Sequence, residues 1–248
     1  MRILRDSDSE KLARLAFEEF RTILATVSET RESVTVGLSG GTSLLEFYRE
    51  FVSSFSTIPE PARKKIRFAL LDERMVPVTD SERNFRMLSE AVFDPLVRLG
   101  MIEPSQILGM PTMSDGFAIP PTALRDTAEF TNPSDIAEAY SQLVPFIEIG
   151  LFGVGPDGHV ASLFPNHPAL DAEGIGYVSV KDSPKPPASR IGISSGMAKS
   201  VPNAFLFFIG ESKRAAYENF FNPAISEREC PAKFLRNSRL AVVTDLDV

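Results

Sequence analysis

The sequence contains little cysteine and no apolar segment of membrane-spanning length. Cys230 is the one cysteine among 248 residues, so no intramolecular disulfide can form, and we expect a reducing compartment. No apolar run approaches the roughly 18 residues that a membrane-spanning helix needs. The N-terminal segment, MRILRDSDSEKLARL, lacks the apolar centre of a secretion signal. We therefore expect a soluble, cytoplasmic protein that does not bind a membrane.

Basic residues are fewer than acidic ones. The chain has 26 Lys and Arg against 33 Asp and Glu, which gives a formal charge of −7. This balance disfavours nucleic-acid binding, because that function needs a basic surface to neutralise phosphates. A small anionic substrate is still compatible with it, since a few focused cations can outweigh a mildly negative average. The length and a hydrophobic content of 43% are typical of a globular protein, and we expect one domain over residues 1–248.

Apolar residues recur with strand and helix periods in alternation along the chain. We expect strands at 34–38, 66–71, 146–154, 177–180, 190–194, 205–209 and 240–244, and helices at 7–27, 44–55, 85–99, 134–144 and 211–221. Ser7 and Glu10 have the spacing of a capping box at the start of the first helix. The alternation predicts an α/β fold with a mostly parallel sheet and helices on both of its faces. Residues 111–134 are rich in Pro and Thr, and we interpret them as a long surface loop rather than a mobile lid.

Three polar segments follow three of the expected strands directly. They are Ser-Gly-Gly-Thr at 39–42, Asp-Glu-Arg at 72–74 and Gly-Pro-Asp-Gly-His at 155–159. The carboxyl ends of parallel strands meet at one edge of a sheet, where ligands bind in open α/β folds. The sequence therefore predicts a binding site built from these three segments.

His159 is the residue most suited to chemistry. The chain has only two histidines, and this one follows a buried strand in a glycine-rich loop. Imidazole titrates near neutral pH, so it can take a proton from water and return it to a leaving oxygen. Asp157 is close enough along the chain to orient the ring. The alternative is a structural histidine within a turn, which we expect instead for His167; the spacing of the two histidines matches no common zinc motif.

The segment at 39–42 and Arg74 are candidates for binding phosphate. Glycines let the backbone approach a ligand, and the free N–H groups at a helix start favour phosphate. The same turn also occurs for simple steric reasons, and it matches neither a Walker loop nor a dinucleotide fingerprint. Arg74 could hold phosphate through two parallel hydrogen bonds, or could instead pair with Asp72 or Glu73.

A proline-rich segment, SPKPPASR at 183–190, carries two further cations. Proline restricts the backbone and could hold Lys185 in position, although a solvated surface lysine is the ordinary alternative. Arg190 lies just beyond. Ser39 and Ser162 are poor candidates for a nucleophile, because neither has the GxSxG sequence of a nucleophile elbow around it.

Four segments together resemble a known family. LSGGTSLLEFY, LLDERMVPVTDSERNFRML, FGVGPDGHVASLFPNHPAL and SPKPPASRI, in this order, look like the signatures of the 6-phosphogluconolactonase family. The resemblance runs from about residue 34 to the last expected strand. It implies a Rossmann-like α/β domain related to ribose-5-phosphate isomerase and CoA transferases. It also implies hydrolysis of 6-phospho-D-glucono-1,5-lactone to 6-phosphogluconate, in the oxidative pentose phosphate pathway, without a metal or an organic cofactor.

The same resemblance implies roles for particular residues. His159 matches the family's catalytic histidine, as general base, and Asp157 its neighbouring aspartate. Positions expected to bind the substrate and its phosphate are Gly40, Gly41, Thr42, Asp72, Arg74, Lys185 and Arg190. The expected partner is a small phosphorylated sugar lactone, with no nucleic acid and no membrane, and the expected state is a monomer or a small homo-oligomer.

The chain departs from the family pattern at three places. Val160 stands where the family usually has Thr, Ser43 where Pro often stands, and Arg83-Asn84 where it has Ser-Asn. None of these changes removes a catalytic group. Arg83 either adds a cation near the pocket or faces solvent, and we expect Asn84 to cap the helix that follows.

Two alternative functions remain open from the sequence. Glucosamine-6-phosphate deaminases share the fold and an Asp-Gly-His loop, but they typically show DEY and an AFNEP-like segment where this chain has DER and ASLFP. The other alternative is a non-catalytic sugar-phosphate sensor. Sensors often carry a DNA-binding module, for which we expect no room here, and the presence of both Asp157 and His159 favours chemistry.

Overall fold

The computed structural model describes residues 1–111 and 132–247. The loop expected over 111–134 therefore lies almost entirely outside the described residues. Among the residues that are described, no helix has both the length and the apolar composition needed to cross a membrane.

The centre of the fold is a seven-stranded sheet in which every neighbouring pair is parallel. Its order is β1-β10-β9-β6-β2-β3-β5. The strands are β1 Arg2–Arg5, β2 Val34–Leu38, β3 Ile66–Leu70, β5 Ile107–Leu108, β6 Ile149–Gly153, β9 Asn203–Phe208 and β10 Arg239–Thr244. The expected parallel sheet is thus confirmed. The sequence pattern missed β1, because in this edge strand only Leu4 is buried and the apolar signal is correspondingly short.

The chain changes direction across the sheet between β2 and β6. From β2 it continues to β3 on one side, whereas from β6 it continues to β9 on the other. Leu38 at the end of β2 is opposite Leu70 of β3 and Leu151 of β6, so these three strands end at the same edge. Such a switch point is where open α/β sheets bind ligands.

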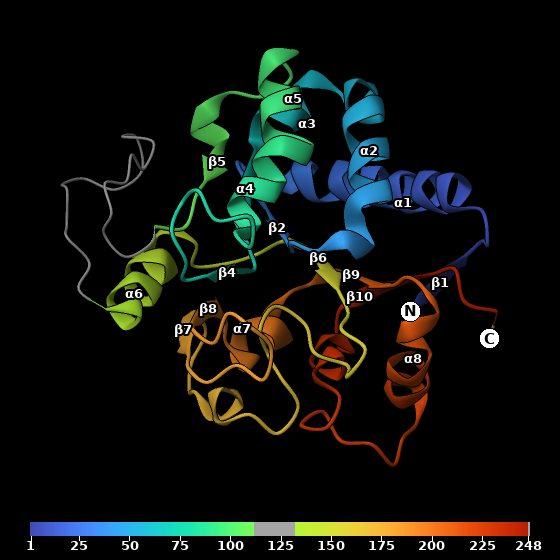
Figure 1. Ribbon diagram of the computed structural model, residues 1–248. Coiled ribbons are helices and arrows are strands. Elements are labelled where there is room, and N and C mark those ends of the chain that lie inside the picture. Colours follow the sequence, from blue (N-terminus) through green and yellow to red (C-terminus); the bar gives the residue numbers. More distant parts are fainter. Residues whose placement is uncertain (112–131, 248) are drawn as a thin grey trace.

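Helices cover both faces of the sheet, with α1 to α5 on one side and α7 and α8 on the other (Figure 1). They are α1 Ser9–Thr30, α2 Leu45–Ser54, α3 Glu60–Lys65, α4 Asn84–Leu88, α5 Asp94–Arg98, α6 Pro133–Leu143, α7 Ser195–Ser200 and α8 Arg214–Phe221. The helix expected at 85–99 is α4 joined to α5 through a π-helical turn at Ser89–Phe93. Aromatic rings fill the space beneath α1 and α2, where Phe20 contacts Phe51 and Phe205 at 5.2 and 6.4 Å between centroids. Burying rings of this size is a major stabilising contribution to the core.

Two of the expected strands belong to a second, smaller sheet. β7 Tyr177–Val180 and β8 Arg190–Ile193 pair antiparallel, and β8 pairs antiparallel with β4 Asp72–Arg74. Strand periodicity located both segments correctly, but it does not say which sheet a strand joins. The short connection between β7 and β8 allows a hairpin and is too short for a crossover helix. The small sheet brings the proline-rich segment next to Arg74.

The start of α1 differs from the expected capping box. Asp8 is the N-cap, and its carboxylate accepts the backbone N–H groups of Glu10 and Lys11, both at 3.1 Å. The capping box of Ser7 and Glu10 is therefore wrong. Aspartate is as good a cap as serine, so two neighbouring candidates could not be separated by residue type.

Candidate active site

The segments predicted to form a site do meet at the carboxyl edge of the large sheet. The turn at 39–42 follows β2, Asp72 lies just beyond β3, and the loop 155–159 follows β6. The small sheet places Arg190 directly opposite Arg74, in register. Of the predicted residues, Asp157, His159 and Lys185 form one contact group, and Arg74 and Arg190 lie near one another.

Asp157, His159 and Lys185 are within hydrogen-bonding distance of each other. His159 Nδ1 is 2.5 Å from Asp157 Oδ1, and Lys185 Nζ is 3.2 Å from each of these atoms. An ionised carboxylate only accepts hydrogen bonds, so we assign the ring proton to Nδ1, which donates it to Asp157. The lysine ammonium then approaches Nδ1 without a hydrogen bond, because both carry protons. This tautomer leaves Nε2 as the atom that can accept a proton.

Asp157 keeps its charge in this arrangement. Burial by itself would raise the pKa of Asp157, but the hydrogen bond from His159 and the charge of Lys185 lower it well below its ordinary value. The carboxylate is therefore ionised at neutral pH. It orients the ring and would stabilise the imidazolium that forms when Nε2 takes a proton.

Close packing holds the imidazole in place. A Cβ on Gly155 would lie 2.0 Å from His159 Cε1 and Nδ1, and the ring also packs on Phe164 at 4.6 Å between centroids. The Gly155 N–H donates to the His159 carbonyl at 2.9 Å, which closes the loop. Gly158 has φ +83 and lies against Cys230, so this position favours glycine both for its backbone and for space. Both loop glycines are thus required by geometry around the histidine.

Arg190 holds the segment that carries Lys185. Its guanidinium donates to the carbonyls of Lys185, Pro186 and Pro187 at 3.2, 3.0 and 3.1 Å, and it is only 4% exposed. Burial lowers the pKa of Arg190, and the charge of Arg74 lowers it further. The bonds to three successive carbonyls indicate that Arg190 positions Lys185. A contact between Arg190 and substrate phosphate stays a prediction.

Arg74 is partly open to solvent and carries bonds that a ligand can replace. Its Nη1 donates to the Glu82 carbonyl at 2.6 Å and lies 3.5 Å from the exposed Glu82 carboxylate. Its Nε has no hydrogen-bond partner among the described residues. The ion pair of Arg74 is with Glu82 and not with Asp72 or Glu73, because Glu73 pairs with Arg83 and Asp72 accepts hydrogen bonds from Asn84 and Ser162. Arg74 thus remains the best placed arginine for an anion.

Arg83 is buried, so the alternative in which it faces solvent is wrong. Its Nε lies 3.5 Å from Glu73 Oε2, and the exposed fractions of the two side chains are 3% and 0%. Burial raises the pKa of Glu73. The charge of Arg83 and the hydrogen bonds that Glu73 accepts from backbone N–H groups oppose this rise. Two of these N–H groups belong to Asn84 and Phe85, at 2.8 Å each, so Glu73 caps the start of α4.

Asp72 and Asn84 are bonded to each other, and Asp72 is also bonded to Ser162 in the segment that follows His159. Asp72 is 6% exposed; its Oδ1 accepts from Asn84 Nδ2 at 3.1 Å and its Oδ2 from Ser162 Oγ at 2.5 Å. A Cβ on Gly40 would lie 2.0 Å from Asn84 Oδ1. The expected cap by Asn84 is wrong, because its side chain points to Asp72. A contact between Asp72 and substrate stays a prediction, and its carboxylate binds the two neighbouring loops.

The turn at 39–42 is built as a glycine turn. Gly41 has φ +103, which side chains rarely adopt, and Thr42 begins the 3₁₀ helix Thr42–Leu44 ahead of α2. The hydroxyl of Tyr48 donates to the Ser39 carbonyl at 2.6 Å and fixes the start of the turn. Gly40, Gly41 and Thr42 are therefore at the edge of the sheet where the sequence predicted them, beside the loop from β6.

Lys213 is a further cation at the site that the sequence did not single out. It ends the 3₁₀ helix Glu211–Lys213, which follows Gly210 at the carboxyl edge of β9. Burial lowers the pKa of Lys213, the charge of Lys185 lowers it further, and Asp157 opposes both. The available signal was a Gly-x-x-Lys sequence after another parallel strand, at the same edge as the three segments that were recognised.

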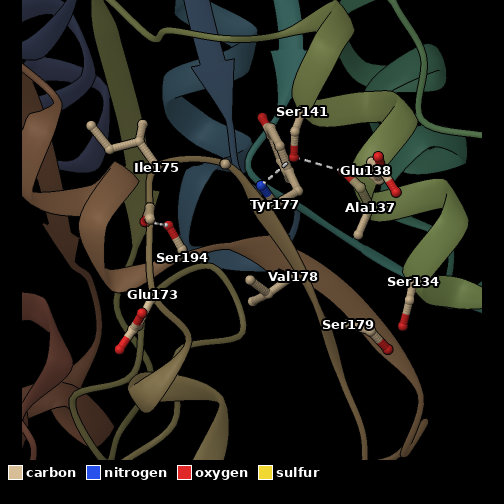
Figure 2. A pocket seen from close by; sticks show the side chains of 12 residues that line it. Ser134, Ala137, Glu138, Ser141, Glu173, Ile175, Tyr177, Val178, Ser179 and Ser194 are labelled. Atoms are coloured by element: carbon tan, nitrogen blue, oxygen red, sulfur yellow. Dashed lines mark hydrogen bonds between the residues drawn. The ribbon is translucent and has the colours of Figure 1, made fainter.

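A separate groove of about 400 Å³ lies between α6 and β7 (Figure 2). Of the residues that the structure describes, its lining includes Glu138 and Glu173 but no predicted site residue and no Lys, Arg or His. Its Ser141 hydroxyl is already bonded, donating to the Ala137 carbonyl and accepting the Tyr177 N–H, both at 2.7 Å. The charged side chains of this described lining are thus acidic, which disfavours a phosphate there.

Residues that could hold a metal are not grouped in residues 1–111 and 132–247. In these ranges no cluster of three or more His, Cys, Asp or Glu has the arrangement needed for a metal ion. The donors at the site are instead an imidazole, a carboxylate and amino or guanidinium groups. Such a set suits proton transfer and anion binding.

Comparison with known proteins identifies the family. A family model described as glucosamine-6-phosphate isomerases/6-phosphogluconolactonase matches residues 7–244. The 6-phosphogluconolactonase of Borreliella burgdorferi is 30% identical over 214 residues, covering 86% of this chain and 83% of the relative. The fold matches that of a 6-phosphogluconolactonase from Trypanosoma brucei with a TM-score of 0.75 at 20% identity, over 98% of this chain and 95% of that one. It also matches a monomeric glucosamine-6-phosphate deaminase with a TM-score of 0.71 at 18% identity, over 99% and 97% of the two chains. The chain therefore belongs to the family of glucosamine-6-phosphate isomerases and 6-phosphogluconolactonases.

Proposed function

We propose that this chain hydrolyses 6-phospho-D-glucono-1,5-lactone to 6-phospho-D-gluconate, in the cytoplasm, with His159 as the general base. The observation that carries the proposal is the contact of His159 Nδ1 with an ionised Asp157, beside Lys185 and near Lys213. This arrangement gives a proton acceptor at Nε2 and several cations near it. Similarity to curated 6-phosphogluconolactonases at 30% identity supports the same reaction.

The reaction needs little more than a positioned base. A lactone carbonyl is already electrophilic, so the enzyme has to place a water molecule and remove its proton. His159 Nε2 takes that proton as the water oxygen attacks C1. The imidazolium, stabilised by Asp157, then protonates the ring oxygen as the tetrahedral intermediate collapses and the C1–O bond breaks. A positioned general base of this kind contributes about 10²–10⁴-fold in rate.

The cations would hold the distant end of the substrate. Arg74, Lys185 and Lys213 come from three separate segments: Lys213 is near Lys185 and Asp157, and Arg74 is paired in register with Arg190, which holds the Lys185 segment. Fixing the phosphate restricts the rest of the sugar, so that C1 meets the water in a reactive geometry. Lys185 would have two roles, since it also lies 3.2 Å from Asp157.

The sequence favours the lactonase over the deaminase. The two activities share the fold, as the TM-score of 0.71 to a deaminase shows, so the fold cannot separate them. The residues after His159 are Val-Ala-Ser-Leu-Phe-Pro, which lack the glutamate that the deaminase pattern carries there. A base that activates water is sufficient for the lactonase.

A direct assay tests the proposal. Freshly generated 6-phosphogluconolactone should be hydrolysed by the protein well above its spontaneous rate, and glucosamine 6-phosphate should release no ammonia. A sensor would bind 6-phosphogluconate yet leave the rate of lactone hydrolysis at its spontaneous value. A deaminase would release ammonia from glucosamine 6-phosphate and would not accelerate lactone hydrolysis. Either of these results would overturn the proposal.

Arg74→Ala should chiefly raise KM. Hydrogen bonds to charged groups contribute about 1.5–3 kcal/mol, so losing the phosphate contact should raise KM at least about tenfold. Steady-state kinetics with the lactone measures this effect. Arg49→Ala is the matched control, because Arg49 pairs with Glu46 on the exposed surface of α2. Equal saturation curves for Arg74→Ala and the wild type would remove Arg74 from phosphate binding.

Lys213→Ala should have the same kind of effect. The lysine is held half-buried near Lys185 with a pKa lowered by burial, so a bound phosphate would compensate the mutual repulsion of the two cations. We expect KM and the inhibition constant of inorganic phosphate to rise together while kcat changes little. Lys11→Ala, on the exposed start of α1, serves as the control. If the phosphate inhibition constant is unchanged, Lys213 does not bind the anion.

A further inference from the structure

The turn that follows His159 has an unusual backbone. Ala161 and Ser162 have φ values of +45 and +63, and the Leu163 N–H donates to the Val160 carbonyl at 2.7 Å across them. For residues other than glycine this region is sterically unfavourable, because Cβ comes too close to the following carbonyl oxygen. Two such residues in succession persist only where their surroundings hold them.

The surroundings of this turn are specific. The Ser162 hydroxyl donates to Asp72 Oδ2 at 2.5 Å, and the exposed fractions of the two residues are 1% and 6%. On its other side the turn packs against β8, where a Cβ on Gly192 would lie 2.4 Å from the Ala161 carbonyl oxygen. A charge-assisted bond between buried groups is among the stronger hydrogen bonds in proteins.

This bond joins the two functional halves of the site. Ser162 lies three residues after His159, and Asp72 lies two residues before Arg74. Asp72 is bonded in turn to Asn84, whose side chain packs on Gly40. A rigid connection therefore runs from the loop with the proton acceptor to the segments expected to hold the phosphate.

We propose that Ser162 is a positioning residue: its bond to Asp72 sets the distance between the His159 imidazole and the bound phosphate. The inference rests on the proposed function of the site. Because the hydroxyl donates a hydrogen bond to a buried carboxylate, Ser162 acts by positioning the loop and not as a nucleophile. Loss of the bond lets the loop shift while the dyad of Asp157 and His159 stays intact. A displacement of 1 Å can reduce the rate by about 10²-fold.

Two substitutions distinguish the effect of losing the Ser162 hydroxyl from the effect of relieving the backbone strain. Ser162→Ala removes the bond and keeps the strained turn, whereas Ser162→Gly removes the bond and relieves the strain. We expect both variants to lose about 10–100-fold in kcat, while KM and the dissociation constant of 6-phosphogluconate stay close to wild type. Ala161→Gly relieves the neighbouring strain but keeps the bond, and it should retain wild-type kcat.

A double-mutant cycle tests the partner. Asp72→Asn should lower kcat in the same way, and the double variant with Ser162→Ala should lose no more than the larger single effect. Independent, additive losses would refute the bridge, as would wild-type kcat in Ser162→Ala, or recovery of kcat in Ser162→Gly. Calorimetric titration with 6-phosphogluconate gives the fraction of folded, binding-competent sites, so a loss of kcat caused by unfolding is recognised as such. Failure of the proposed function would appear differently, as absence of turnover in the wild type.

Discussion

His159→Gln should abolish most of the lactone hydrolysis and leave the fold intact. Glutamine fills similar space but cannot take a proton at neutral pH, so the contribution of a general base, about 10²–10⁴-fold in kcat, is lost. The cations expected to bind the phosphate are unchanged, and KM should stay near that of the wild type. Stopped-flow measurement of proton release, corrected for spontaneous hydrolysis, gives both constants.

His167→Gln is the control, because it alters the only other histidine. His167 Nε2 lies 2.9 Å from the Lys181 carbonyl and its Nδ1 accepts the Ala169 N–H at 3.1 Å, so both ring nitrogens are used in the structure. We expect this variant to unfold at a lower temperature but to keep wild-type kcat. If His159→Gln turned over as fast as His167→Gln, another group would have to be the base.

The features that the sequence predicted correctly depend on local order along the chain. The family, the parallel sheet and the meeting of three loops at its carboxyl edge follow from strands that alternate with helices. The same reasoning predicted that Asp157 orients the His159 ring, since two residues so close in one tight loop lie near each other. Lys185 was found through its proline-rich segment, and its contact with Asp157 at 3.2 Å required only that this loop fold over the site.

The features that were missed depend on the direction of a side chain. Asn84 is at a helix start in both prediction and structure, yet it turns towards Asp72, and Glu73 from a distant segment caps the helix instead. Arg190 is near the site as expected, but its donors are bonded to carbonyl groups of its own loop. Such choices are made by tertiary packing, on which spacing in a single sequence carries no information.

Gly155→Ala should inactivate the protein without removing a reacting group. The backbone of Gly155 does not need positive φ, but a Cβ there would lie 2.0 Å from two atoms of the His159 ring and 2.7 Å from Asp157 Oδ1. The ring and the Asp157 carboxylate must shift to relieve these contacts, which disturbs the hydrogen bond between them. Since a shift of 1 Å can reduce the rate by about 10²-fold, we expect at least that loss in kcat, with KM little changed because the cations keep their positions.

Gly100→Ala distinguishes this effect from a general cost of replacing glycine. Gly100 has φ +63, and a Cβ there would meet no atom of residues 1–111 or 132–247 within 4 Å, so alanine strains the backbone without a steric contact in these ranges. The two variants should therefore show opposite patterns: Gly100→Ala loses stability in thermal unfolding and keeps its kcat, while Gly155→Ala loses kcat out of proportion to its stability. In Gly155→Ala the NMR signal of the proton on His159 Nδ1 should also change, because its hydrogen bond to Asp157 is lengthened. Wild-type kcat in Gly155→Ala would mean that the imidazole works from another position, and the contact of Asp157 with His159 would then not be the catalytic arrangement.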